Sequence, residues 1–327
     1  MLRMAVVGMG IGGSHGAEIH RSASAELVAI CDCDPEKLKW RLKTYAEEID
    51  AHPKGYLDLE EMLAAERLDG LVISTPSGVH HQQAVVAAKH GVHLLIDKPI
   101  DITLEHIDAI ERAVADAGVL CGVNYQMRWV PAHRAVKKAI EAGQFGRLLM
   151  VDVRLKWFRD QAYYDRGGWR ATWEMDGGGS LMNQGAHLMD LLTWFAGRAV
   201  KVHGDYAALN HDIQTEDWAA AIVQFEGGVR SVITTTTNVA PKNDRNFIEV
   251  HGTEGSAWLV NDEIVETNIE SLKCPPQPEF TSPVEDFIDA ITHGRPPEVT
   301  VEQARRSVEL ILGIYESARA GRAVSLI

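Results

Sequence analysis

Short apolar runs alternate with longer amphipathic stretches through the first 123 residues. The runs indicate buried strands, because strands covered on both faces read as nearly continuous apolar segments. Strands that alternate with helices predict a parallel, doubly wound α/β sheet. The predicted strands are Met4–Val7, Leu27–Cys31, Leu71–Ile73, Val92–Ile96 and Val119–Val123, and the helices include Pro35–Glu48, Leu57–Ala65, Val79–His90 and Leu104–Ala117.

The pattern changes after Asn124, where long strands follow one another without helices between them. Gly227-Gly228 is a hairpin turn signal between two of these strands. We therefore predict a second α+β domain with a large, open and mainly antiparallel sheet, which divides the chain into domains 1–123 and 124–327. The predicted strands are Leu148–Phe158, Trp218–Phe225, Val229–Thr237, Asn246–His251 and Ser256–Val260; the helices are Val130–Ala142, Ser180–Phe195, Pro283–His293 and Val301–Ala320, with a linker at 274–278.

A glycine-rich segment follows the first predicted strand directly. Gly8, Gly10 and Gly13 have the G-x-G-x-x-G spacing, and a predicted helix continues to Arg21. These glycines permit a tight turn and let a pyrophosphate approach the helix N-terminus. Asp32 follows Gly13 by 32 − 13 = 19 residues, close to the ~20 expected for the acid that binds the ribose of a dinucleotide. Strand, helix and acid together disfavour the alternative of a simple glycine-rich turn.

The carboxylate of Asp32 favours NAD over NADP, because it can accept hydrogen bonds from both ribose hydroxyls and would repel a 2′-phosphate. His80 begins a predicted helix, where two positions are open to it: facing the cofactor, or on the surface at the helix N-terminus. The residues expected to contact NAD are Gly8, Gly10, Ile11, Gly12, Gly13, Asp32, Ser74, Thr75, Pro76, His80, Asp97, Lys98 and Gln126.

The apolar run Val92–Ile96 is followed by Asp97 and then by Lys98. In doubly wound sheets, ligands bind outside the carboxyl ends of the strands. Lys98 is therefore expected where a reacting group of a substrate would lie.

Composition excludes several classes of partner. The formal net charge is −14, which disfavours nucleic acids and anionic membranes because both need clustered positive charge. No apolar run approaches the ~18 residues of a membrane span, and we expect no signal peptide because Met1–Ala5 leads straight into a predicted strand. The cysteines offer no disulfide framework and no paired zinc motif, so we expect no metal and a reduced, cytoplasmic protein. The four cysteines are Cys31, Cys33, Cys121 and Cys274.

Taken together, several motifs resemble the glucose–fructose oxidoreductase/inositol dehydrogenase (Gfo/Idh/MocA) superfamily. The likeness covers essentially the whole chain, and the order and spacing of the motifs make it specific. The motifs are Gly8–Gly13 with His15, Thr75-Pro76-Ser77 with His80, Asp97-Lys98-Pro99, and Gly177-Gly178-Gly179 with Asn183, His187 and Asp190. The family usually has Glu at the place of Asp97, and many members have Asp at the place of Asn183.

The resemblance implies that Lys98 and His187 flank the nicotinamide and the reacting hydroxyl. Chemistry supports these roles, since a neutral histidine can take a hydroxyl proton and an ammonium can stabilise developing negative charge. Asn183, His187 and Asp190 have the spacing of one helix face, so Asn183 can orient a neighbour and Asp190 can fix the histidine tautomer. Without the resemblance, the residues alone favour a different interpretation, in which His187 is a core histidine whose hydrogen bonds are made within the protein.

The segment between Leu148 and Gly177 is expected to bind the substrate, because it contains both arginines and aromatic side chains. Arginines suit carboxylates or phosphates, and aromatic faces suit sugar rings. The alternative is a solvated strand face or a subunit contact. The candidates are Tyr163, Trp169 and Arg170, joined by Arg128 near the domain junction.

The predicted function is an NAD-dependent dehydrogenase that takes a hydride from a secondary hydroxyl of a sugar, sugar acid, nucleotide-sugar or cyclitol. Two alternatives remain open. One is an NAD-dependent glycosidase that oxidises C3 transiently, and the other is a non-catalytic nucleotide sensor, which would need neither Lys98 nor His187. We also expect a homodimer or homotetramer joined through the second sheet, because strand side chains alternate between faces and an open sheet leaves apolar surface. The residues carrying that expectation are Val223, Phe225, Val229, Val232 and Ile233.

Overall fold

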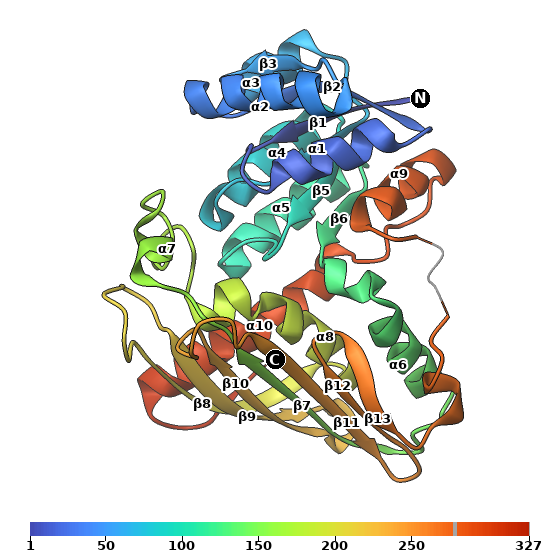
Figure 1. The fold of residues 1–327 in the computed structure, drawn as a ribbon, viewed down its shortest axis with the longest axis vertical. Helices are drawn as coiled ribbons and strands as arrows, with labels where there is room; N and C mark the ends of the chain where they lie inside the picture. Colours follow the sequence, from blue (N-terminus) through green and yellow to red (C-terminus); the bar gives the residue numbers. More distant parts are fainter. Residues whose placement is uncertain (277–279, 327) are drawn as a thin grey trace. The chain divides into compact units, whose positions relative to one another are not determined.

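The computed structural model describes residues 1–276 and 280–326, so Gln277 and Pro278 of the predicted linker lie outside the described residues. The chain forms two compact units (Figure 1). The first comprises residues 1–125 and 282–301, and the second comprises residues 126–281 and 302–327. The first boundary thus lies two residues beyond the predicted one. No helix in the described ranges is both long enough and apolar enough to cross a bilayer.

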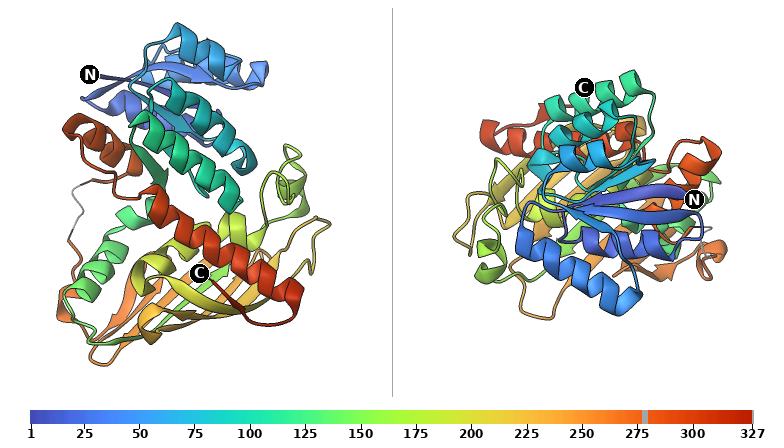
Figure 2. Two further views of the ribbon diagram at one scale, coloured as in Figure 1. Left: turned by 180° about the vertical axis from the view of Figure 1, so that it is seen from behind. Right: turned by 90° about the horizontal axis from the view of Figure 1, so that it is seen from above.

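The first unit contains a six-stranded parallel sheet in the order β3-β2-β1-β4-β5-β6, which confirms the predicted doubly wound fold. Helices cover both faces of this sheet (Figure 2). The strands are β1 (Leu2–Val7), β2 (Ala25–Cys31), β3 (Lys54–Tyr56), β4 (Gly70–Ile73), β5 (His93–Asp97) and β6 (Cys121–Asn124); the helices are α1 (Gly12–Arg21), α2 (Pro35–Ile49), α3 (Leu59–Ala65), α4 (His80–Lys89), α5 (Leu104–Ala117) and α9 (Pro283–His293).

Local sequence signals explain where the helices of this unit begin and end. The side chain of Asp34 accepts hydrogen bonds from the first turn of α2, and Thr103 does the same for α5. Such caps satisfy backbone N–H groups that have no partner within the helix. Gly118 ends α5 in the left-handed conformation, which glycine adopts without steric cost. The short strand β3 was missed in the sequence, because it has only three residues.

Residues 282–301 belong to the first unit, whereas the sequence assigned them to the second domain. The reason is packing: Val284, Phe287 and Ile288 of α9 are buried in the same core as residues of β1 and α1. The backbone N–H of Val123 also bonds to the Val299 carbonyl oxygen. A periodic pattern identifies α9 as an amphipathic helix, but it does not identify the surface against which the helix packs.

The second unit contains an eight-stranded sheet in the order β13-β12-β11-β7-β10-β9-β8-β14. It is mostly antiparallel, as predicted, but β7 and β10 pair in parallel at its centre. The strands are β7 (Leu148–Lys156), β8 (Ala199–Ala207), β9 (Trp218–Phe225), β10 (Arg230–Thr236), β11 (Arg245–Gly252), β12 (Ser256–Val260), β13 (Glu263–Thr267) and β14 (Val324–Ser325); the helices are α6 (Pro131–Glu141), α7 (Gln161–Asp165), α8 (Ala186–Ala196) and α10 (Val301–Ala320).

The two faces of this sheet differ. On the covered face, α8 packs on β7, and α10 runs along the sheet (Figure 2). Val223, Phe225, Val229 and Ile233 are all buried, so four of the five residues named for an oligomer contact belong to the core of the unit itself. Val232 alone is exposed, opposite Ile222 in the register. The homo-oligomer therefore stays a prediction, and those four core residues do not support it.

The predicted helix over 180–195 is two elements. Ser180–Gln184 forms a π-helical turn, in which the Gly185 N–H bonds to the Ser180 carbonyl oxygen, and α8 starts at Ala186. The single predicted helix is therefore interrupted between Asn183 and α8, whereas His187 and Asp190 lie three residues apart within α8. That Asn183 shares a face with these two residues stays a prediction.

Candidate functional site

The glycine loop between β1 and α1 has the form that a dinucleotide phosphate group requires. Gly8 has φ +91°, and a side chain there would collide with the carbonyl oxygen of Ser74 at the end of β4. Only glycine can occupy such a position without strain. No side chain caps the start of α1, which leaves its positive end available to an anion.

Asp32 is held at the end of β2 beside this loop. Its carboxylate accepts hydrogen bonds from the Met9 N–H at 2.7 Å and the Asp34 N–H at 2.9 Å. Lys37 lies 3.3 Å from the same group. The predicted ribose-binding acid is therefore next to the glycine loop. Lys37 adds a positive charge there that the sequence reading did not consider.

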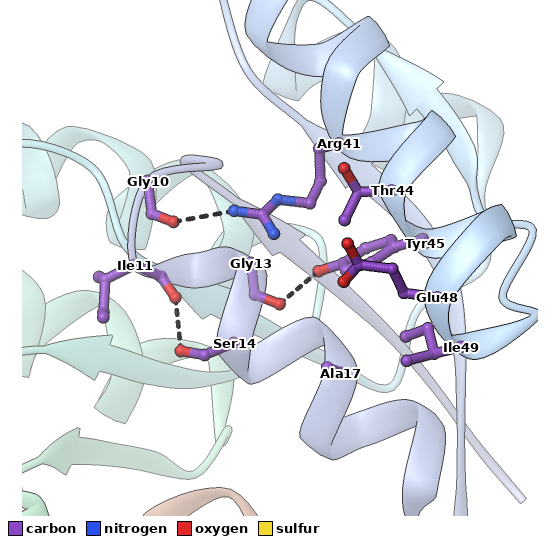
Figure 3. Close-up of a pocket in the computed structure, with 10 residues that line it drawn as sticks. All are labelled: Gly10, Ile11, Gly13, Ser14, Ala17, Arg41, Thr44, Tyr45, Glu48 and Ile49. Atoms are coloured by element: carbon purple, nitrogen blue, oxygen red, sulfur yellow. Dashed lines mark hydrogen bonds between the residues drawn. The ribbon is translucent and has the colours of Figure 1, made fainter.

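A pocket of about 290 Å³ lies between the start of α1 and the face of α2 (Figure 3). Arg41 reaches across it to the carbonyl oxygens of Met9 and Gly10, and the Tyr45 hydroxyl donates to the Gly13 carbonyl oxygen at 2.8 Å. Residues of the glycine loop line the pocket, but Asp32 and the ends of β4 and β5 do not. The pocket therefore covers part of the predicted cofactor site. The Arg41 and Tyr45 side chains hold the glycine loop in place by hydrogen bonds to its carbonyl oxygens.

A buried network fixes the residue that precedes Lys98. Asp97 accepts a hydrogen bond from Asn124 at 2.6 Å and lies 3.1 Å from the Nε2 atom of His15. Burial alone would raise the pKa of Asp97, but hydrogen bonds with His15, Ser74 and Asn124 hold it at about 2. Burial likewise acts to lower the pKa of His15, yet its bond to Asp97 raises it overall. Asp97 is therefore charged at neutral pH, and hydrogen bonds hold one of its carboxylate oxygens directly before Lys98.

His80 does not lie on the surface. It is fully buried, and its two ring nitrogens face the carbonyl oxygens of Thr75 at 2.9 Å and Pro99 at 3.1 Å. The Thr75 hydroxyl donates to Gln83. His80 thus ties the loop after β4 to the loop after β5, which carries Lys98. A direct contact between His80 and the cofactor stays a prediction.

The predicted site residues Ser74, Thr75 and Pro76 follow β4, and Lys98 follows β5. Parallel strands end at one edge of a sheet, so these loops share the edge at which the glycine loop follows β1. Lys98 is half-buried there, in a cis peptide bond with Pro99. The first unit therefore brings together most of the residues expected to contact NAD. Gln126, at the start of a 3₁₀ turn, belongs to the second unit and is exposed.

In the second unit, His187 lies in the first turn of α8 and is half-buried. Asn183 precedes it in the π-helical turn and donates from its side chain to Asp176 at 2.6 Å. Gly179 directly precedes that turn. Its backbone lies so close to Glu216 that a side chain at position 179 would collide with the Glu216 carbonyl oxygen. Asn183 is thus oriented by Asp176, a partner that the sequence reading did not name.

Arg128 and Asp190 form a buried ion pair. The Arg128 guanidinium donates to both carboxylate oxygens, at 2.8 and 2.6 Å, and also to Gln303 at 2.7 Å. Both side chains are 1% exposed. Arg128 therefore does not join the substrate-reading arginines as predicted, because its guanidinium is engaged in the core. Asp190 likewise orients Arg128, and its expected role of fixing the His187 tautomer gains no support.

The segment after β7 does gather its aromatic and cationic side chains. The guanidinium of Arg170 lies 5.0 Å from the ring centre of Tyr163 and 4.8 Å from that of Trp169. Arg159 lies over the same tyrosine, whose hydroxyl accepts a hydrogen bond from Gln184. This contact links the segment to the π-helical turn that carries Asn183. The predicted trio of Tyr163, Trp169 and Arg170 is thus one cluster.

A buried acid that the sequence reading missed supports the same turn. Glu216 accepts hydrogen bonds from the Gly179 and Leu181 N–H groups and from the Tyr315 hydroxyl. Burial raises the pKa of Glu216 to about 7, although these hydrogen bonds act in the opposite direction. No local motif identifies Glu216, since its donors lie 35 to 99 residues away.

Two family models match the chain. Residues 2–125 match an oxidoreductase family with an NAD-binding Rossmann fold, and residues 133–258 match the GFO/IDH/MocA C-terminal domain. The WlbA dehydrogenase of Bordetella pertussis, solved with NADH and UDP-GlcNAcA, is 33% identical with a TM-score of 0.90 over 100% of this chain and 98% of its own. The scyllo-inositol 2-dehydrogenase (NAD(+)) of Bacillus subtilis is 26% identical over 99% of this chain and 96% of its own. The D-apiose dehydrogenase of Paraburkholderia graminis is 26% identical over 92% and 83%.

Proposed function

The chain belongs to the GFO/IDH/MocA family of NAD-binding oxidoreductases, and on that premise we propose that it oxidises one secondary hydroxyl of an anionic sugar, with Lys98 and His187 acting on that hydroxyl. The observation that carries the proposal is the placement of Lys98. It follows β5 at the edge of the sheet that also bears the glycine loop, and Asp97 before it is fixed by His15 and Asn124. NAD, when bound at the glycine loop, supplies the acceptor for the hydride.

Lys98 has the chemistry to stabilise the oxygen during this reaction. As the hydroxyl loses its proton, negative charge develops on the oxygen, and an ammonium placed beside it lowers the energy of that state. The loop carrying the lysine is tied at Asp97 and at Pro99. Holding the loop at these two residues keeps the ammonium group in position, so that it can stabilise the charge without a rearrangement of the loop.

His187 has the chemistry to take the hydroxyl proton. Neutral imidazole is a base near physiological pH, because its unperturbed pKa is ~6.5. Asn183 carries no charge and cannot accept the proton, and its side chain is turned to Asp176. In this proposal the hydroxyl proton goes to His187, the hydride goes to NAD, and a ketone is the product.

An anionic substrate is favoured by the segment after β7. Arg166 and Arg170 form no ion pair with any described carboxylate, while Tyr163 and Trp169 place aromatic faces beside Arg170. Guanidinium groups bind carboxylates and phosphates, and aromatic rings pack on sugar C–H surfaces. The WlbA dehydrogenase, which binds UDP-GlcNAcA, has an acidic, diphosphate-linked sugar as its ligand.

The test is a substrate panel with purified full-length protein and NAD. It should contain cyclitols, neutral sugars, sugar acids and UDP-linked sugars with and without a uronic carboxylate, and NADH formation is followed by absorbance. Stoichiometric NADH with the acidic sugars supports the proposal. Sugar release without NADH accumulation would instead identify a glycosidase, and binding without either reaction would identify a sensor. Faster turnover of neutral cyclitols would overturn the anionic preference.

A further inference from the structure

A second polar cluster lies in the first unit, apart from the residues assigned to NAD. Asp101 is fully buried in the loop between β5 and α5, and two imidazoles contact it. His81, in the first turn of α4, places its Nδ1 atom 3.1 Å from one carboxylate oxygen. His106, in the first turn of α5, places its Nδ1 atom 2.7 Å from the other. The two rings stack, with centroids 3.5 Å apart and 20° between their planes.

From this geometry we infer that His81, Asp101 and His106 form a binding site for a divalent transition-metal ion such as Zn²⁺. One ligand atom of each residue lies within 4.8 Å of the others. Tetrahedral zinc with ligands at 2.0–2.2 Å separates neighbouring ligand atoms by about 3.3 Å. The two nitrogens lie 3.1 and 2.7 Å from different oxygens of the Asp101 carboxylate, both shorter than that value. To admit the ion, the imidazoles must therefore draw back from the carboxylate and turn toward one point.

The donor types select the class of ion. Two imidazole nitrogens and one carboxylate oxygen suit zinc, copper, nickel or iron, whereas magnesium and calcium prefer oxygen ligands alone. The single negative charge of the carboxylate offsets half of the charge of a dication. The His81 and His106 side chains remain 18% and 31% exposed, so an ion and a water ligand can enter from solvent.

The carboxylate is also held in place independently of the ion. Asp101 accepts hydrogen bonds from the His81 N–H at 3.0 Å and the Ile102 N–H at 2.6 Å. Supporting bonds of this kind orient metal ligands. The starts of α4 and α5 oppose a cation through their positive dipole ends. We therefore expect binding weaker than at a site of several thiolates or carboxylates.

The ion would fasten three segments together. Asp101 lies three residues beyond Lys98, and His81 follows His80, which bonds to the Pro99 carbonyl oxygen. A metal at this cluster would join the starts of α4 and α5 to the loop that carries Lys98. We infer a structural role, because the site shares no residue with the set assigned to NAD and the reacting hydroxyl.

The experiment is a calorimetric titration of untagged full-length protein with Zn²⁺, combined with thermal unfolding. We expect one equivalent to bind and the melting temperature to rise, since a ligand that binds the folded state stabilises it. His81→Gln and His106→Gln should each weaken binding by at least ~10-fold, and the double variant should lose the equivalent. Asp101 is left intact because its removal could unfold the loop.

His52 provides the matched control. It lies 3.0 Å from Asp50 on the surface and is one imidazole beside one carboxylate. His52→Gln should leave the zinc titration unchanged, and the double variant at the cluster should show no rise in melting temperature on adding Zn²⁺. If the wild-type protein took up no zinc from an equimolar solution, or if the double variant bound it as tightly, the inference would be wrong.

Discussion

The two units position the residues of the candidate site in different ways. In the first, Gly8, Asp32 and Lys98 all follow strands of one parallel sheet, so the topology alone brings them to one edge. In the second, Asn183 is held by Asp176 of the preceding loop, Tyr163 contacts Gln184 across 21 residues, and Glu216 supports the turn that carries Asn183 across 35 residues. In a parallel sheet, the residues of a site can therefore be predicted from the positions where the strands end. A site built on loops and turns depends on contacts between separate segments, and no local sequence pattern specifies those contacts.

The catalytic variants should show the largest effects, and they compare the two units directly. Lys98→Met should abolish turnover, because the neutral side chain cannot stabilise the developing charge, while NAD affinity stays nearly unchanged. His187→Ala should reduce turnover by a factor of about 10²–10⁴, the usual contribution of a positioned base. Steady-state kinetics with the best substrate of the panel, together with NAD titration, measures both effects.

Full activity of a folded His187→Ala protein would remove the proposed base. Loss of NAD binding in Lys98→Met would place the lysine in the cofactor site and leave its effect on the hydroxyl unproven.

The next prediction concerns the buried pair of the second unit. Asp190→Leu should lower the free energy of unfolding by about 3–5 kcal/mol, because it leaves the Arg128 guanidinium buried without its counter-charge. Urea denaturation followed by tryptophan fluorescence measures the change.

Glu47→Gln is the control for that measurement, since the Lys43–Glu47 pair is exposed on α2 and should contribute less than ~0.5 kcal/mol. Equal losses of unfolding free energy in the two variants would show that the buried pair stabilises the protein no more than the exposed pair does.

The sequence predicted the first unit well because its signals are local. Asp32 was found by counting from Gly13, and the structure brings it to the Met9 N–H. Apolar periodicity likewise located α5 and α10 at their observed bounds. The π-helical turn at Ser180–Gln184 escaped prediction, since one extra residue in a helix leaves no signature in hydropathy.

The roles of Arg128 and Asp190 were misread for a related reason. Each was interpreted through its neighbours in the sequence, whereas its contacts are set by the packing of α8 against a distant 3₁₀ turn. A charged residue that pairs in the core and one that binds a ligand look alike in a single sequence.

A smaller effect is expected in cofactor selectivity. Asp32 should make NAD bind about 10-fold or more tightly than NADP, which corresponds to one charge-assisted hydrogen bond gained and a phosphate repelled. Asp32→Ser should narrow that ratio, because Lys37 beside it could then face a 2′-phosphate. Titration of both cofactors into apo protein gives the ratio, and a preference of the wild-type protein for NADP would contradict the assigned role.

The smallest expected effect is the pH dependence of the His15–Asp97 contact. The pKa of His15 is raised from 6.5 in the folded state, since its bond to Asp97 outweighs the effect of burial. Protonation of His15 therefore stabilises the folded protein below pH 6.5, and this contribution is lost as the pH rises through the folded-state pKa.

His15→Gln keeps a side chain that can donate to Asp97 but cannot titrate. The difference in unfolding free energy between wild type and variant, measured by urea denaturation, should be largest at acidic pH and shrink as the pH rises. His52→Gln, which removes an imidazole from an exposed pair, is measured alongside as the control for loss of a histidine outside the core. A difference that grows with pH would mean that His15 is neutral when it contacts Asp97, and the fixed charge assigned to the residue before Lys98 would then lose its main support.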